Sequence, residues 1–166
     1  MPFFAWRHWR WIRDAGIALV FLLGIRAYQR RDMPKGSAPP LAGTDLRGEP
    51  VSLADYRGKP VLLHFFATWC GVCKIEQHNI DAVTGDLPVL SVASNSGSGN
   101  EVADFVRQRG ILPRVVLDEE GALASRFGVH AYPSTFVIDG SGEIRHVEVG
   151  YTTELGLRAR MWLAGL

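Results

Sequence analysis

Cysteine is nearly absent from this sequence: two of its 166 residues are cysteines, Cys70 and Cys73, and they stand three positions apart. Two thiols this close cannot form a framework of several disulfides, so an apolar core must hold the fold. A structural zinc site would need two further ligands at similar spacing. The chain has no second cysteine pair and its five histidines are scattered, so the composition disfavours such a site.

The chain also lacks a large net charge, which is +1 in total. Residues 1–35 carry seven Arg or Lys against two Asp, whereas residues 36–166 carry eleven against fifteen Asp or Glu. The mildly acidic main part argues against a nucleic-acid partner. The basic N-terminal segment is typical of sequence that flanks a membrane.

No apolar run reaches the ~20 residues that cross a bilayer; the longest, residues 15–25, has 11. The wider window 9–28 is bordered by side chains that prefer the membrane interface, Trp6, Trp9, Trp11 and Tyr28. Arginines near the ends of such a helix can extend to the interface. We therefore predict one N-terminal membrane-anchor helix within residues 1–32. A cleaved signal peptide is the main alternative, and a surface helix is another.

Residues 33–43 contain three prolines and two glycines, so they cannot form a regular helix and are predicted to be a semi-extended linker. The remaining residues, 44–166, are predicted to form one domain in which strands and helices alternate. We expect a short hairpin within residues 46–53, then strands over 61–66, 89–93, 115–117, 135–138 and 144–149. Helices are expected over 70–84, 101–109 (with Asn100 as its cap), 122–127 and 154–164. This order predicts a mixed α/β sheet with helices on both faces.

Cys70 and Cys73 suit thiol–disulfide exchange, which needs an exposed thiolate and a second thiol that resolves the mixed disulfide. Residues three apart lie on one face of a helix, and a helix N-terminus favours the thiolate of the first cysteine. Cys70 is thus the expected nucleophile and Cys73 the resolving thiol. Trp69 and Gly71 complete the pattern Trp-Cys-Gly-x-Cys, which is more specific than a lone CxxC.

Two stretches resemble one protein family. Residues 66–73 resemble the active-site segment of thioredoxin-like proteins, and residues 131–139 resemble the cis-proline segment of that family. The resemblance implies a thioredoxin fold, here with an N-terminal β-hairpin extension. It also implies that Pro133 is cis beside the cysteines and that the backbone of Tyr132 pairs with a substrate strand. A trans proline that opens a strand is the alternative.

Residues 55–61, with the early hairpin, resemble the membrane-anchored TlpA/ResA branch of the thioredoxin-like family. Residues 73–77 and 149–164 most resemble its ScsD-type (suppressor for copper sensitivity) members. This resemblance implies a single-pass protein of the bacterial inner membrane with its domain in the periplasm.

Three positions leave the details of the chemistry open. His64 stands where thioredoxins carry a buried acid, and it is either a proton acceptor or a histidine hydrogen-bonded in the core. Val72 replaces the proline of the thioredoxin dipeptide, so the redox potential is not fixed. Glu76 matches an acidic position of the TlpA/ResA branch and either tunes the thiol pKa or is an exposed helix carboxylate.

Together these features predict an oxidoreductase that reduces disulfides of envelope proteins through the Cys70/Cys73 dithiol. A membrane reductant of the DsbD type would restore the dithiol, and no metal or further cofactor is expected. A DsbA-like donor of disulfides is an alternative, which the redox potential distinguishes. A Cu(I)-handling protein is another, because two thiolates suit this soft ion. A role in haem maturation is a third.

Overall fold

The structure is a computed structural model that describes the backbone of residues 3–111 and 113–165, with side chains described from residue 11 onward. Residues 1–2 of the predicted anchor and residue 166 of the predicted domain lie outside the described residues, as do the side chains of Trp6 and Trp9. The chain divides into two compact units, Met1–Arg31 and Asp32–Leu166.

The first unit contains one helix, α1 (Phe3–Arg30), as the sequence predicts. The apolar side chains of its central part are exposed, among them Val20 and Phe21. Arg13 forms an ion pair with Asp14 at 2.9 Å, so these two charges partly neutralise each other. Among the described residues, no helix combines the length and the apolar character that crossing a bilayer requires.

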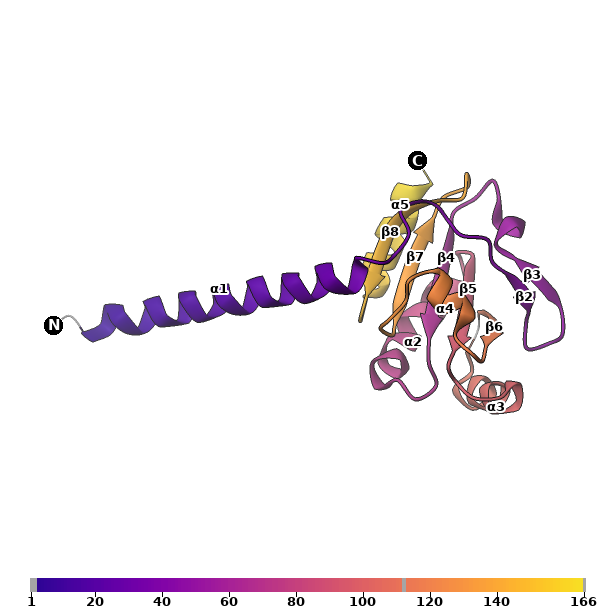
Figure 1. The fold of residues 1–166 in the computed structure, drawn as a ribbon, viewed down its shortest axis with the longest axis horizontal. Coiled ribbons are helices and arrows are strands. Elements are labelled where there is room, and N and C mark those ends of the chain that lie inside the picture. The colour runs from indigo at the N-terminus through magenta and orange to yellow at the C-terminus, as the bar shows by residue number, and fades with distance from the viewer. Residues whose placement is uncertain (1–2, 112, 166) are drawn as a thin grey trace. The chain divides into compact units, whose positions relative to one another are not determined.

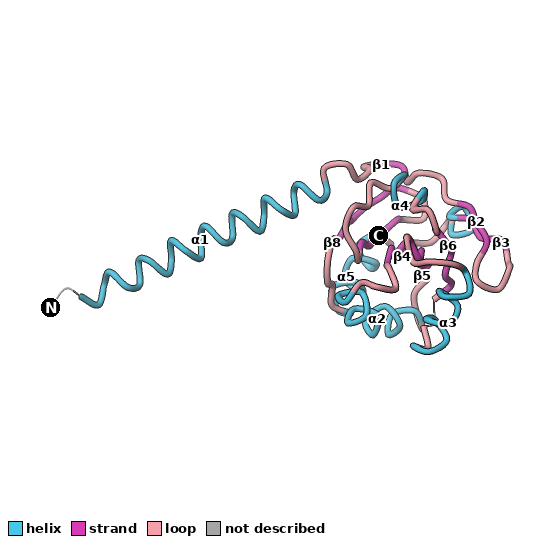
Figure 2. The backbone as a smooth tube through the Cα atoms, turned by 60° about the horizontal axis from the view of Figure 1, so that its bottom comes forward, coloured by secondary structure: helices cyan, strands magenta, loops and turns pink. Residues whose placement is uncertain are grey.

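The second unit is built around a six-stranded mixed sheet in the order β1-β8-β7-β4-β5-β6 (Figures 1 and 2). The strands are β1 (Gly36–Ser37), β4 (Val61–Phe66), β5 (Val89–Ser94), β6 (Arg114–Asp118), β7 (Ser134–Ile138) and β8 (Glu143–Val149). Strands β4, β5 and β6 run parallel, whereas β7 runs antiparallel to both β4 and β8. The predicted mixed sheet is confirmed.

Strand β4 lies in the middle of the sheet and is buried along its whole length, as its nearly continuous apolar sequence predicts. Its side chains alternate between two cores. Val61, Leu63 and Phe65 point to one core, which α4 (Ala122–Arg126) and the N-terminal part of the domain cover. Leu62 and Phe66 point to the other face, where α2 (Gly71–Thr84) and α5 (Glu154–Ala164) lie side by side and α3 (Gly99–Arg109) covers the far end (Figure 1).

Residues 33–43 differ from the linker that the sequence predicts. Gly36 and Ser37 pair with β8 as the edge strand β1, and the side chains of Met33 and Leu41 are buried in the core. Gly128 allows this close packing, because a Cβ atom there would collide with the carbonyl oxygen of Asp32. Proline content therefore excluded helix correctly, but it did not separate these residues from the domain.

Two local boundaries also differ from the prediction. The early hairpin pairs β2 (Ala42–Thr44) with β3 (Pro50–Ser52), so its first strand lies before the predicted range of residues 46–53 and its second strand lies within it. Helix α3 is capped by Ser98 and not by Asn100, because Ser98 and Glu101 form a reciprocal capping box. The other predicted helices and strands are present with ends that differ by a few residues.

Candidate active site

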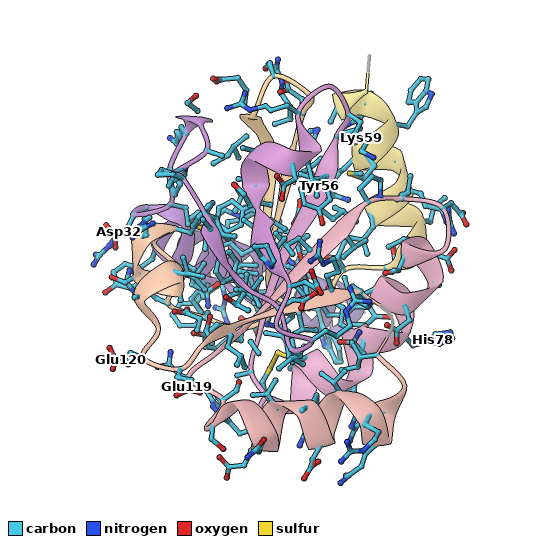
Figure 3. All side chains as sticks on the ribbon, turned by 90° about the vertical axis from the view of Figure 1, so that its right-hand side faces the viewer. Asp32, Tyr56, Lys59, His78, Glu119 and Glu120 are labelled. Atoms are coloured by element: carbon cyan, nitrogen blue, oxygen red, sulfur yellow. A yellow bond between two sulfur atoms is a disulfide. The ribbon has the colours of Figure 1, made fainter. Side chains whose placement is uncertain are left out.

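The two cysteines lie where β4 leads into α2, and they form a disulfide with a Cα–Cα distance of 5.3 Å (the yellow bond in Figure 3). Cys70 is the N-cap of α2, and its sulfur accepts a hydrogen bond from the backbone N–H of Cys73 at 3.1 Å. The helix N-terminus thus points a donor at the sulfur, as a thiolate there would require. Cys70 is 7% exposed and Cys73 is 2% exposed, so Cys70 is the better placed of the two for attack by a partner.

The solvent side of the disulfide is bordered by three residues that we call the outer cluster: Trp69, Asn95 and Tyr132. The indole N–H of Trp69 donates to the carbonyl oxygen of Asn95 at 2.8 Å, and the side-chain amide of Asn95 donates to the Tyr132 hydroxyl at 3.0 Å. The rings of Trp69 and Tyr132 meet edge to face at 5.8 Å. Trp69 remains 64% exposed, so the cluster presents an ordered aromatic surface to a partner.

Tyr132 and Pro133 lie next to the disulfide, as the sequence predicts. The peptide bond between them is cis, and the Tyr132 carbonyl oxygen lies 3.5 Å from the sulfur of Cys70. Strand β7 follows directly at Ser134. A backbone segment that approaches Cys70 would therefore meet the main chain of Tyr132 at the start of a strand.

Glu76 is buried, which contradicts its interpretation as an exposed helix carboxylate. It lies one helical turn after Cys73, on the same face of α2. Burial raises the pKa of this carboxyl to about 7, although the N–H of Thr152 donates to its Oε1 at 2.7 Å and opposes the rise. A buried carboxyl that titrates near neutral pH can accept or return a proton during thiol chemistry.

His64 is also buried, and burial lowers its pKa to about 3, so the imidazole is neutral at physiological pH. Its Nδ1 atom is 3.0 Å from the Thr135 hydroxyl and 4.0 Å from Oε2 of Glu76. Ser91 is the neighbour of His64 on β5. We call these four residues, His64, Glu76, Ser91 and Thr135, the inner cluster.

The remaining predicted site residues lie at the start of α2. Gly71 is the first helical residue, and Val72 is 45% exposed beside the disulfide. His78, in the middle of α2, is not one of these residues and points away from the domain into solvent (Figure 3). Within the described part of the chain, no three His, Cys, Asp or Glu residues are grouped closely enough to hold a metal ion.

Sequence reasoning missed Asn95, Thr135 and Thr152 as parts of the site. Asn95 has a left-handed backbone, with φ of +50°, in the loop between β5 and α3. Its position just after a buried strand is the one signal that could have identified it. Thr152 contacts Glu76 through its backbone N–H, which no side-chain pattern reveals.

Comparison with known proteins agrees with this geometry. The AhpC/TSA family matches residues 34–147 of the chain. The thiol-disulfide oxidoreductase ResA of Geobacillus kaustophilus is 32% identical over 122 residues, which cover 71% of this chain and 70% of ResA. The thioredoxin-like protein YneN of Bacillus subtilis is 29% identical over 167 residues, which cover 92% of this chain and 96% of YneN.

Among solved structures, a thiol:disulfide interchange protein of the thioredoxin family from Chlorobium tepidum superposes with a TM-score of 0.69 at 27% identity. The match covers 79% of this chain and 96% of that protein. The mixed sheet with helices on both faces is thus the fold of thioredoxin-family proteins.

Proposed function

The chain belongs to the AhpC/TSA family and is a thioredoxin-like thiol–disulfide oxidoreductase, and from this we propose that it acts as a reductant at the bacterial inner membrane. The observation that carries the proposal is the position of Cys70. Its sulfur caps α2, accepts the N–H of Cys73, and lies between an exposed tryptophan and the backbone of Tyr132. This arrangement provides both an attacking sulfur and a surface for the target.

In the proposed reaction, the thiolate of reduced Cys70 attacks one sulfur of a target disulfide. The target S–S bond breaks, a mixed disulfide forms, and the second target sulfur leaves as a thiolate that takes up a proton. The Cys73 thiol then gives its proton to the Glu76 carboxylate and attacks the sulfur of Cys70. The first target sulfur leaves and is protonated in turn, so two electrons pass to the target, together with the proton of Cys73 and one proton from water.

The direction of electron flow is proposed from the charge beside the thiols. Above neutral pH, Glu76 is an anion one helical turn from Cys73, and a nearby anion disfavours a thiolate. A destabilised thiolate weakens the reduced form relative to the disulfide and makes the dithiol more reducing. We therefore propose that the dithiol alone carries the electrons, without a further cofactor, and that a membrane reductant of the DsbD type restores it.

The redox potential tests this direction. We expect equilibration of the full chain with glutathione to give a value near that of thioredoxin, about −270 mV, and not near that of DsbA, about −120 mV. A value close to DsbA would reverse the proposed direction. Stoichiometric Cu(I) uptake by the reduced chain without disulfide exchange would instead favour metal handling.

The proposed location rests on α1. Its central side chains are apolar and exposed, and basic residues lie toward both of its ends. We propose that α1 attaches the protein to the inner membrane and that the domain acts on disulfides of periplasmic proteins. Fractionation of cells that produce the full chain tests this. Membrane recovery that depends on residues 3–30 supports it, and recovery in the soluble fraction contradicts it.

A Cys73→Ala chain should retain targets as mixed disulfides for identification.

A further inference from the structure

The inner cluster lies one layer below the disulfide, between β4 and α2. Alternate residues of β4 face α2, so Leu62, His64 and Phe66 form successive layers. Leu62 packs in the core formed with α5, and Phe66 packs with both cysteines. His64 falls between these apolar layers, at the level of Glu76. The polar layer is therefore separated from solvent but adjacent to the layer that contains Cys73.

Three polar atoms of this layer have no hydrogen-bond partner among the described residues: His64 Nε2, Glu76 Oε2 and Ser91 Oγ. Buried polar atoms are nearly always satisfied, and exceptions often mark functional sites. The Oε1 atom of Glu76 is held by Thr152, so Oε2 is the atom that remains to carry a proton. The nearest ion-pairing atom to Oε2 is Nδ1 of His64, at 4.0 Å.

The surroundings of His64 favour one tautomer of the neutral imidazole. A proton on Nε2 would be a buried donor without an acceptor, which is costly. A proton on Nδ1 has the Thr135 hydroxyl at 3.0 Å as its acceptor. We therefore assign the N–H group to Nδ1, which is also the ring nitrogen that forms the contact with Oε2 of Glu76. At 4.0 Å it acts on the carboxyl through its dipole, since this distance is too long for a hydrogen bond.

We propose that His64 is a positioning residue for thiol exchange, which acts through Glu76 by keeping the positive end of its Nδ1–H dipole near the carboxyl oxygen Oε2. This inference rests on the proposed role of Glu76 as the proton acceptor of Cys73. The dipole stabilises the ionised carboxylate, which burial alone would disfavour. His64 thereby keeps Glu76 able to accept the Cys73 proton at neutral pH.

The other two members of the inner cluster, Thr135 on β7 and Ser91 on β5, do not titrate in this range. Glu148 on β8 is the strand partner of Thr135, and it is paired with Arg160 of α5 at 2.8 Å. Among the described residues, the groups that can titrate at this site are therefore His64, Glu76 and the reduced cysteines.

The test compares His64→Leu with His64→Asn in the full chain. An asparagine side chain places its amide close to the position of Nδ1 and keeps a donor there, whereas leucine has none. His78→Leu is the matched control, because His78 is an exposed histidine on the same helix as Glu76. The measurements are the pH dependence of the exchange rate and a carbon-13 NMR titration of the Glu76 carboxyl.

We expect His64→Leu to raise the midpoint of both titrations by about one pH unit, which reduces the carboxylate fraction below the midpoint about tenfold. The wild-type midpoint should be retained in His64→Asn and His78→Leu. Equal midpoints in His64→Leu and the wild type would overturn the inference. Nitrogen-15 NMR of the unaltered chain provides a test that does not depend on folding of the variants, and a proton on Nε2 would also overturn it.

Glu76→Gln separates this inference from the proposed function. If that variant keeps the wild-type pH profile, the role of Glu76 as proton acceptor is wrong. If Glu76→Gln abolishes the titration while His64→Leu leaves it unchanged, only the role of His64 is wrong.

Discussion

The outer and inner clusters border the same disulfide but differ in how their polar groups are satisfied. In the outer cluster, the indole of Trp69 and the amide of Asn95 donate hydrogen bonds although they lie near solvent. In the inner cluster, which is buried, three polar atoms have no partner among the described residues. The difference indicates that the outer bonds fix the shape that a partner meets, whereas the inner cluster is arranged to control a proton.

The largest effect should come from the cysteines between the two clusters. We expect Cys70→Ser to reduce the rate of protein-disulfide reduction by at least about 10³-fold, because the nucleophile is lost. Cys73→Ala should instead accumulate mixed disulfides, which non-reducing gel electrophoresis detects. Exchange activity that survives in Cys70→Ser would remove the basis for placing either cluster in an active site.

The next largest effect should come from the inner cluster, in the way the free energy of unfolding depends on pH. The pKa of Glu76 is raised from 4.5 to about 7 in the folded chain. Its stabilising contribution to the free energy of unfolding is therefore full below pH 4.5 and is lost as pH rises toward 7. The pKa of His64 is lowered from 6.5 to about 3, so its contribution is lost as pH falls below 6.5. Between pH 4.5 and 6.5 the two effects oppose each other, and the wild type should show little net change from this pair.

Single variants should separate the two opposing slopes of the free energy of unfolding against pH. In Glu76→Gln, the free energy of unfolding should rise by about 1.4 kcal/mol per pH unit between pH 4.5 and 6.5, because His64 remains. In His64→Asn it should fall with pH by a similar amount, because Glu76 remains. Urea unfolding at several pH values measures both slopes. Slopes of the same sign in the two variants would contradict the opposed burial of these groups.

The outer cluster should affect recognition more than stability. Trp69→Phe loses the hydrogen bond to Asn95 but keeps an aromatic ring, so we expect a loss of about 1 kcal/mol or less in the free energy of unfolding. KM for a protein disulfide should rise severalfold, while the rate with a small-molecule disulfide changes less. Equal changes with both substrates would show that the cluster does not contribute to binding of a protein partner.

The smallest effect should come from the backbone of Asn95. Alanine disfavours the left-handed conformation that Asn95 adopts, whereas glycine accepts it. Both variants lose the amide, so their difference isolates the backbone, and Asn95→Ala should be about 1 kcal/mol less stable than Asn95→Gly. Equal stabilities in denaturant unfolding would indicate that the loop relaxes to another conformation.

The sequence predicted those parts of the molecule that depend on local pattern. The apolar run of β4 and the cysteines after it predicted a buried strand that leads into a helix, and the structure has both. The burial of Glu76 could not be decided, because it depends on the loop around Thr152, which is 76 residues away in sequence. The same holds for residues 33–43, whose packing depends on β8 and α4 from the far end of the chain.

Strand β1 bears on how the chain would behave if it were shortened. Gly36 and Ser37 cover part of the outer edge of β8, and Met33 and Leu41 cover apolar residues of the core. A form that begins at residue 44 would leave this edge open as a template for strands of other molecules. Such a form is expected to aggregate, whereas one that begins at residue 32 keeps β1 paired with this part of the edge.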